Sequence, residues 1–167
     1  DGLVKHNGPI YDLTPMDEML GENFFKKKIK FENQPSLEAQ VASLSDDIAY
    51  NSHDLEDGLK SNLFNLRDLE NIPILNKIVR KHTKKIKNYS VDLVIRQIVR
   101  EIINEMVKDL ITTTKENIKK NKIRNLDDVL KSKYPLVTFS NKMQKFDKKI
   151  KIFLRKKMYY HKKVKSN

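Results

Sequence analysis

The segment SVDLVIRQIVREIINEMVKDL, residues 90–110, decides the class of fold. Its apolar residues recur at intervals of three and four, which places them on one face of an α-helix. Ser90 is of the residue type that caps helix amino termini, so we predict a helix over about 91–119 with one buried stripe. That stripe consists of Val91, Val94, Ile95, Ile98, Ile102, Met106 and Leu110.

The residues before this segment also favour helices. Residues 8–34 are predicted to be mostly irregular, with a short helix around 15–21. Pro35 and Ser36 then open a predicted helix that runs to about Gly58, with Ser36 as its cap. Two shorter helices are expected over about 59–70 and 73–86, the second with Pro73 in its first turn.

The residues after the long helix continue the same pattern. Asn125 is expected to cap a short helix that runs through Lys131 and is broken by Pro135. Ser140 opens a last predicted helix of about 141–160. Its inward face is expected to consist of Met143, Phe146, Ile150, Phe153, Leu154 and Met158. The chain as a whole is therefore predicted to be all-α.

Composition supports this class and excludes others. Among 167 residues there are only 4 Gly and 5 Pro, too few for the many tight turns of an all-β fold. With no cysteine, neither a disulfide framework nor a thiolate metal site is available. No apolar run approaches the ~20 residues of a membrane-spanning helix, and the first residues lack the pattern of a secretory signal. We expect a cytoplasmic protein without membrane association.

The net charge of +12 is unevenly distributed. Residues 1–60 contain 6 Lys and Arg against 12 Asp and Glu, whereas residues 61–167 contain 28 against 10. Such a basic half can bind nucleic acid or other phosphates; the alternative is a lysine-rich, solvated surface. We predict a single helical unit, with an acidic part over 1–60 and a basic part over 61–167.

The predicted helix after Ser36 differs from the rest because no Lys or Arg occurs between Lys30 and Lys60. Its apolar face is formed by Leu37, Val41, Leu44, Ile48 and Leu55. Asp46 lies opposite that face, among small residues at Ala39, Ala42 and Ala49. Small residues around an acid indicate a face that is also covered. The alternative is an acidic, exposed face with Tyr50 packed at its edge, and spacing leaves both interpretations open.

Asp46, Tyr50 and Asp54 are spaced four residues apart, so they climb one side of the helix by about 6 Å per step. A covered carboxylate must be paired, hydrogen-bonded or bound to a metal. Asp46 could hold a cation while Tyr50 and Asp54 contact a ligand along the helix.

Histidine does not complete a metal site at Asp46. His53 lies two helical turns away, about 10 Å along the axis. His82 and His161 belong to basic stretches that repel cations. Only His6 could approach, and one His with one Asp makes a poor site for a divalent ion.

Residues 37–42 and 45–59, LEAQVA and SDDIAYNSHDLEDGL, closely resemble the deoxyguanosine triphosphate triphosphohydrolase-like family of the HD-domain phosphohydrolases. Residues 2–9, GLVKHNGP, are similar to the loop before this helix in that family. Residues 100–110 and 153–161 resemble its later helices. The resemblance covers essentially the whole chain and implies the carboxy-terminal portion of a helical HD-type domain, without the first HD helices.

The implied activity is metal-assisted hydrolysis of a deoxynucleoside triphosphate, such as dGTP, to the deoxynucleoside and tripolyphosphate. By this resemblance Asp46 matches the family's metal-ligating Asp. Tyr50 and Asp54 match positions that contact the deoxyribose, and Lys5 matches a lysine near the phosphates. Mixed His and carboxylate ligands suit Mn, Mg, Fe or Co.

The same resemblance implies that ligands are missing. In the family a His and a His-Asp pair precede the position of Asp1, so three of the four expected ligands are absent from this chain. We expect the chain alone to lose the metal and to be inactive, and we assign it no catalytic residue. Its expected partners are the dNTP, a missing amino-terminal HD segment or subunit, and a second copy of the chain. The alternative function is a non-catalytic basic helical module that binds nucleic acid or nucleotide.

Overall fold

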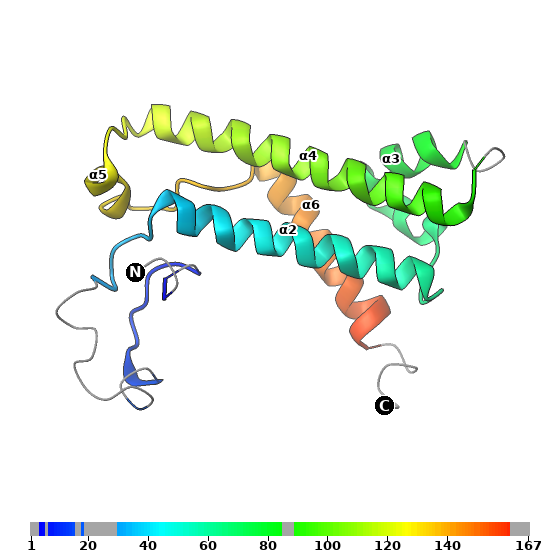
Figure 1. The fold of residues 1–167 in the computed structure, drawn as a ribbon, viewed down its shortest axis with the longest axis horizontal. Helices are drawn as coiled ribbons and strands as arrows, with labels where there is room; N and C mark the ends of the chain where they lie inside the picture. The colour runs from blue at the N-terminus through cyan, green and yellow to red at the C-terminus, as the bar shows by residue number, and fades with distance from the viewer. Residues whose placement is uncertain (1–3, 6, 16–17, 19–29, 85–88, 161–167) are drawn as a thin grey trace. The chain divides into compact units, whose positions relative to one another are not determined.

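The computed structural model describes residues 4–5, 7–15, 18, 30–84 and 89–160. Every regular element among them is helical, which confirms the predicted all-α class. Figure 1 shows them in chain order: α2 (Leu37–Lys60), the 3₁₀-helix η1 (Leu66–Asn71), α3 (Pro73–Thr83), α4 (Val91–Lys120), α5 (Leu126–Leu130), α6 (Asn141–Leu154) and the π-helical turn η2 (Arg155–Tyr159). None of the described helices is long and apolar enough to cross a membrane.

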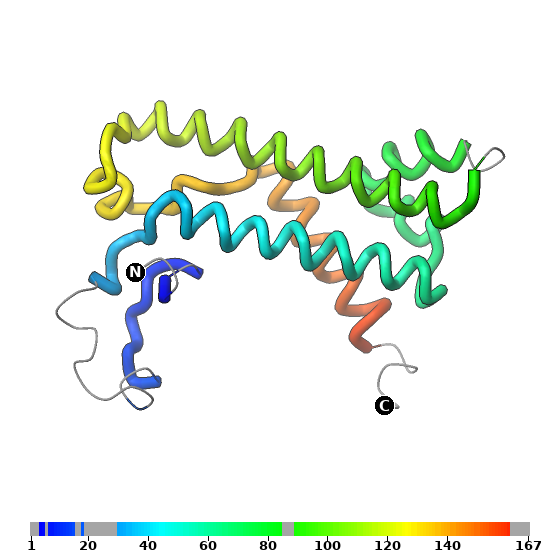
Figure 2. Tube along the Cα trace, viewed as in Figure 1, coloured from blue at the N-terminus to red at the C-terminus, as the bar shows by residue number. Residues whose placement is uncertain are grey.

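The chain divides into two compact units, and the division falls within α2 and within α4. Unit 1 contains Asp1–Ser45 and Thr112–Thr138, and unit 2 contains Asp46–Ile111 and Phe139–Asn167. Figure 2 follows the chain from the end of α4 through α5 and a non-helical stretch to the start of α6.

The predicted helix starts are confirmed by their caps. In each, a side-chain oxygen accepts a hydrogen bond from the backbone N–H three residues further on, which satisfies a donor that the helix itself leaves unpaired. The donor–acceptor distances are 3.4, 3.3, 3.0 and 3.3 Å for Ser36, Ser90, Asn125 and Ser140. α3 begins at Pro73, as predicted.

Most of the predicted apolar stripes are buried. The stripe of α4 is buried from Val94 to Leu110, but Val91 is exposed because it lies at the first residue of the helix. On α6, Met143, Phe146, Ile150 and Leu154 are buried, whereas Phe153 and Met158 are half-buried. On α2, Ile48 and Leu55 are buried, Leu37 and Leu44 are half-buried, and Val41 is exposed.

The predicted helix over 59–70 is wrong. Asn62 adopts a left-handed conformation, φ 54°, which ends the helical path after Lys60. The buried ring of Phe64 then folds back onto Gly58, where an added Cβ would lie only 2.2 Å from the ring. The next element, η1, starts only after Asn65, whose side chain accepts from the backbone of Arg67.

The last predicted helix, 141–160, is helical to Tyr159 but changes type along its length. α6 ends at Leu154, and the chain continues as a π-helical turn in which Tyr160 N donates to Arg155 O at 3.2 Å. The predicted helix around 15–21 lies largely outside the described residues, within which Pro15 and Glu18 are helical.

Within unit 1, a buried glutamine joins α2 to a segment almost a hundred residues away. Gln40 is 5% exposed, and its Nε2 donates to Pro35 O at 2.9 Å. Its Oε1 accepts from the backbone N–H groups of Leu136 and Val137 at 2.8 and 3.0 Å. All three bonds involve buried backbone groups, which makes them costly to leave unmade.

We predict that Gln40→Leu lowers the free energy of unfolding by about 2–4 kcal/mol, because the backbone donors of Leu136 and Val137 lose their acceptor in a buried setting. Urea unfolding followed by circular dichroism measures the change. Gln144→Leu is the control, because Gln144 is exposed and makes a single bond to Phe139 O. Equal stability of Gln40→Leu and the wild type would contradict the assignment.

Candidate functional site

Three side chains of unit 2 form one hydrogen-bonded group. Tyr50 and Asp54 lie one turn apart on α2, and Tyr159 reaches them from η2. The Tyr159 hydroxyl is hydrogen-bonded to the Asp54 carboxylate and lies 2.9 Å from the hydroxyl of Tyr50. A carboxylate only accepts, so Tyr159 donates its one hydrogen to Asp54, and the bond between the two phenols then takes its hydrogen from Tyr50.

The electrostatics of this group keep Tyr159 protonated. Burial disfavours the phenolate, and the neighbouring Asp54 carboxylate and Tyr50 hydroxyl raise the pKa of Tyr159 further above its ordinary value of 10.0. The hydroxyl therefore stays a hydrogen-bond donor at every physiological pH.

A second polar network lies one turn earlier on α2. Lys151 of α6 donates to Asp47 at 3.0 Å and forms an ion pair with Asp147 at 3.0 Å. The buried Asn51 donates from Nδ2 to the other oxygen of Asp147, also at 3.0 Å. Partial burial opposes the charge on Lys151, but its bonds to Asp147 and Asp47 outweigh burial and raise the pKa of Lys151.

α6 is anchored to α4 by the residue that precedes it. Ser140, the cap of α6, donates from its backbone N–H and its hydroxyl to the two oxygens of Asp109 on α4, at 2.8 and 2.6 Å. From that start, α6 crosses the second half of α2 (Figure 1) and is hydrogen-bonded to Asn51 and Asp47.

The two networks line a cavity of about 420 Å³. Its lining includes Tyr50, Asp54, Lys151, Arg155 and Tyr159. Tyr50, which lines this cavity, is 61% exposed. An aromatic face beside a carboxylate and cationic groups can bind a polar molecule that also has an apolar surface, such as a sugar.

Asp46 differs from the expectation of a covered carboxylate. It is exposed, as are its flanking residues Ala42 and Ala49, whereas Ala39 is buried. The physical reason is that α6 contacts Asp47 and Asn51, and η2 contacts Asp54, so that neither covers Asp46. Tyr50 and Asp54 of the predicted acidic face contact Tyr159, whereas Asp46 is exposed. The alternative of an exposed face with Tyr50 at its edge therefore fits better at Asp46.

A metal site is not assembled by the part of the chain that the structure describes. Within it, no three His, Cys, Asp or Glu side chains lie close enough together to hold an ion. His53 is exposed, and His6 and His161 lie outside the described residues. The fit of a divalent ion to these residues alone is therefore poor: Asp46 offers one carboxylate.

Lys5 belongs to unit 1, whereas Asp46, Tyr50 and Asp54 belong to unit 2. Its side chain is 1% exposed, and its ammonium group donates to Lys30 O at 2.9 Å and to Asn33 O at 3.1 Å. Burial lowers the pKa of Lys5. The structure thus gives Lys5 an anchoring role in the loop before α2 that the sequence analysis missed.

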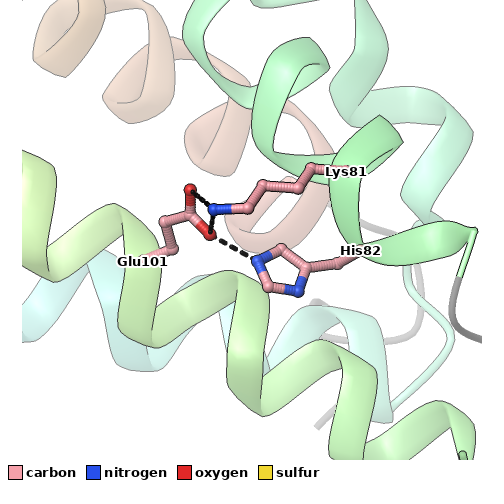
Figure 3. Close-up of polar contacts among 3 residues, drawn as sticks. All are labelled: Lys81, His82 and Glu101. Atoms are coloured by element: carbon pink, nitrogen blue, oxygen red, sulfur yellow. Dashed lines mark hydrogen bonds and ion pairs between the residues drawn. The ribbon is translucent and has the colours of Figure 1, made fainter.

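A second titratable cluster joins α3 to α4 within unit 2 (Figure 3). The Glu101 carboxylate accepts from Lys81 Nζ at 2.8 and 3.0 Å and is hydrogen-bonded to Nε2 of the buried His82. Burial favours protonation of Glu101, but its bonds to Lys81 and His82 outweigh burial and lower the pKa of the carboxyl. The basic stretch around His82 gave no signal of this acidic partner, which lies 19 residues further on.

This cluster borders a surface cavity of about 630 Å³ along α4. Arg100 and Lys108 also line it, and neither has an ion-pair partner among the residues described. The Glu101 carboxylate can neutralise positive charge at the end of α3 and hold that end against α4. The side chains of Arg100 and Lys108 remain exposed to solvent.

No family model matches the chain, but curated relatives do. The deoxyguanosinetriphosphate triphosphohydrolase-like protein of Pelagibacter ubique (strain HTCC1062) is 49% identical over 164 residues, which is 98% of this chain and 44% of the relative. The proteins of that name from Neorickettsia sennetsu and Rickettsia prowazekii are 35% and 38% identical, over 96% and 95% of this chain and 41% of each relative.

These matches confirm the resemblance that the sequence analysis found. The chain spans less than half the length of the curated relatives it matches, as expected for a portion of such a protein.

The cluster of Figure 3 predicts an acid-sensitive contribution to stability. Because the pKa of Glu101 is lower in the folded chain than its usual 4.5, the contribution is present above pH 4.5 and is lost as the pH falls through the folded pKa. We expect Glu101→Gln to lower the free energy of unfolding by about 1–2 kcal/mol at pH 7 and to have little effect near pH 3.

Urea unfolding at the two pH values checks this. Glu105→Gln is the matched control, because Glu105 is exposed on the same helix and forms no ion pair within the described chain. A Glu101→Gln deficit that is as large in acid as at neutral pH would contradict the electrostatic explanation.

Proposed function

From homology with the deoxyguanosinetriphosphate triphosphohydrolase-like family over 98% of this chain, we propose that the chain is part of a metal-dependent hydrolase of deoxynucleoside triphosphates. The products are the deoxynucleoside and tripolyphosphate. The observation that carries the proposal is the 49% identity to a relative of that name over 164 residues. The cavity beside Tyr50 and Asp54 supports it, because the groups that line it suit a sugar.

The proposed roles of Tyr50 and Asp54 follow from their chemistry. One Asp54 carboxylate accepts up to about four hydrogen bonds, so it can accept a sugar hydroxyl while it still accepts from Tyr159. The exposed ring of Tyr50 offers an apolar face to the carbon side of a deoxyribose. Together they give one polar and one apolar contact to the same ring.

Lys5 is proposed to bind the phosphates. Its ammonium group donates to the carbonyls of Lys30 and Asn33. A phosphate contact therefore requires that phosphate oxygens replace these acceptors. A charged acceptor forms a stronger hydrogen bond with an ammonium group than a neutral carbonyl does, which supports such an exchange.

Asp46 is proposed as one ligand of a divalent Mn, Mg, Fe or Co ion. Its exposure leaves the carboxylate accessible to further ligands. We propose that these come from the part of the relatives that this chain does not span, or from a separate subunit that supplies it. Residues 1–167 alone would then not retain the ion.

A second candidate function is electrostatic binding of nucleic acid or nucleotide by the basic half. The observation in its favour is the outer face of α6, where exposed lysines lie without ion-pair partners among the described residues. They are Lys142, Lys145, Lys148 and Lys149. Phosphate-rich chains bind such faces without needing a metal.

The hydrolase proposal predicts that the complete protein that carries these residues hydrolyses dGTP or another dNTP with Mn²⁺. Asp46→Asn should lower kcat by roughly 10³-fold or more, because a catalytic metal supplies several kcal/mol of stabilisation to the transition state. Asp57→Asn, an exposed acid on the same helix, should leave the rate unchanged. Phosphate-release or chromatographic assays of the products measure both.

Residues 1–167 alone are expected to show no hydrolysis. If they hydrolysed dGTP with Mn²⁺ and lost this activity on Asp46→Ala, the expected inactivity would be wrong. If the complete protein hydrolysed none of the dNTPs, the proposed function would fail.

The alternative function predicts binding to labelled single-stranded DNA with a steep salt dependence. Lys145→Gln and Lys149→Gln should each reduce the slope of log K against log[salt] by about 0.7, and Asp46→Ala should change nothing. Lys131→Gln is the control, because Lys131 is paired with Asp127 at 2.5 Å. Fluorescence anisotropy at several salt concentrations checks this, and no binding at low salt would exclude it.

A further inference from the structure

We propose that the outward face of α4 is a docking surface, and that its occupant is an amphipathic helix with acidic side chains from the part of the relatives that this chain does not span. The inference rests on the proposed function for what the docked part does, namely to complete the metal site. It adds the surface on which that part is held. This surface lies between Leu93 and Ile111 of α4, within unit 2.

The first observation is an apolar row on α4 that the described residues do not cover. Ile103, Val107 and Ile111 are spaced four residues apart, and they are 36, 38 and 50% exposed. Leu93 is 41% exposed and points in the same direction as Ile111, at about 100° per residue. Ile102 of the buried stripe lies on the opposite side of the helix from Ile111. α4 therefore has apolar residues on two opposite sides.

Such a row fits a second helix. A helix at the surface of a soluble unit normally has one apolar stripe, directed toward its own core. Side chains at i, i+4 and i+8 form one of the ridges that pack into the groove of a neighbouring helix. Exposed apolar side chains that are contiguous and bordered by polar groups mark interaction sites.

The second observation is the charge beside the apolar row. The cavity of about 630 Å³ along α4 is lined by two residues of the row and by Arg100 and Lys108. Neither of these two cations has an ion-pair partner in the described part of the chain. The charges of Lys81 and Glu101 neutralise each other, and Glu105 is the one other acid in the lining. The surplus positive charge is complementary to acidic side chains on the docked helix.

The third observation is the length of the relatives. The matched region is less than half of each of them, so more than half of each relative lies outside it. On the proposed function that part supplies metal ligands to join Asp46. It must therefore be held firmly against this chain, and the apolar row on α4 provides an area that can be buried on contact.

A second copy of the chain fits the same surface less well. If two copies of α4 packed antiparallel across Val107, a two-fold axis would relate them, and residues near the axis would lie beside their own copies. Lys108 directly follows Val107, so two ammonium groups would lie on the same side of one contact. Like charges in such a contact repel each other, whereas an acidic helix provides them with partners.

The test uses introduced cysteines, because residues 1–167 contain none. Val107→Cys and Ile111→Cys are made separately in residues 1–167 and in the complete protein. Mass spectrometry of the peptide that contains the new cysteine then measures its rate of modification by iodoacetamide. We expect both cysteines to react roughly tenfold or more slowly in the complete protein than in residues 1–167, because the docked helix blocks access to the thiol.

Val99→Cys is the matched control. Val99 lies on the same helix and is buried, so its cysteine should react slowly in both proteins, and urea-denatured samples give the rate of an accessible thiol. Equal rates for Val107→Cys and Ile111→Cys in the two folded proteins overturn the proposal. Slow modification of residues 1–167 that becomes faster on dilution also overturns it, because the occupant is then a second copy. Protection that requires added single-stranded DNA overturns it in favour of nucleic acid.

The acidic character of the occupant is tested with Lys108→Glu, combined with Ile111→Cys. In the complete protein this change should raise the modification rate by roughly 3- to 10-fold, relative to its effect in residues 1–167, because the docked acids lose a cation and meet a carboxylate. Lys142→Glu is the control, because Lys142 is an exposed lysine of α6, and it should leave the ratio of the two rates unchanged. An unchanged ratio for Lys108→Glu contradicts an acidic partner.

Modification of a cysteine does not depend on hydrolysis, so the two proposals can fail separately. Protected cysteines in a complete protein that hydrolyses no dNTP overturn the proposed function and support the docking surface. Cysteines that react at the full rate in a complete protein that hydrolyses dGTP with Mn²⁺ overturn the docking surface alone.

Discussion

The hydrogen bonds from Ser140 to the Asp109 carboxylate set the geometry of unit 2. They fix the residue at which α6 starts and the point on α4 from which it departs. Ser140 also caps α6 through Met143 N, so one side chain both begins the helix and ties it to its neighbour. The side-chain contacts that α6 and η2 make with α2 lie downstream of this point, from Asp147 with Asn51 to Tyr159 with Asp54. Because the helix has a fixed rise of about 1.5 Å per residue, a shift of its start would move all of the later residues by the same amount.

α2 meets these contacts with acidic and amide groups in place of a second apolar stripe. Lysine is abundant in the basic half and absent from residues 31–59. No lysine of α2 before Lys60 therefore competes with Lys151, which forms ion pairs with Asp47 and, within α6, with Asp147. Its raised pKa is the sign of that complementarity. Partly exposed ion pairs of this kind add little stability. Their effect is to set which turn of α6 faces which turn of α2.

Sequence periodicity was sufficient for the class of fold and for most helix starts, because caps and apolar stripes are local features. Ser36, Ser90, Asn125 and Ser140 act as predicted for that reason. The errors come from contacts that helical periodicity does not encode. The packing of Phe64 on Gly58 lies beside the left-handed turn that ends α2, which no propensity of residues 59–70 reveals. Likewise, spacing on α2 grouped Tyr50 with Asp54 but could not show Tyr159, whose approach depends on the π-helical turn after α6.

The described residues form contacts around Tyr50 and Asp54 but not around Asp46, and this difference has a physical cause. Asp54 and Tyr50 are both hydrogen-bonded to Tyr159, which lies in the same unit. Asp46 lies only two turns earlier but is exposed, and no described residue joins it in a metal-binding group. A carboxylate without neighbours binds a divalent ion weakly, because a stable site needs several ligands at about 2 Å. On the proposed function, this chain therefore supplies recognition of the sugar, and the chemistry at the phosphate requires ligands from the part of the relatives that it does not span.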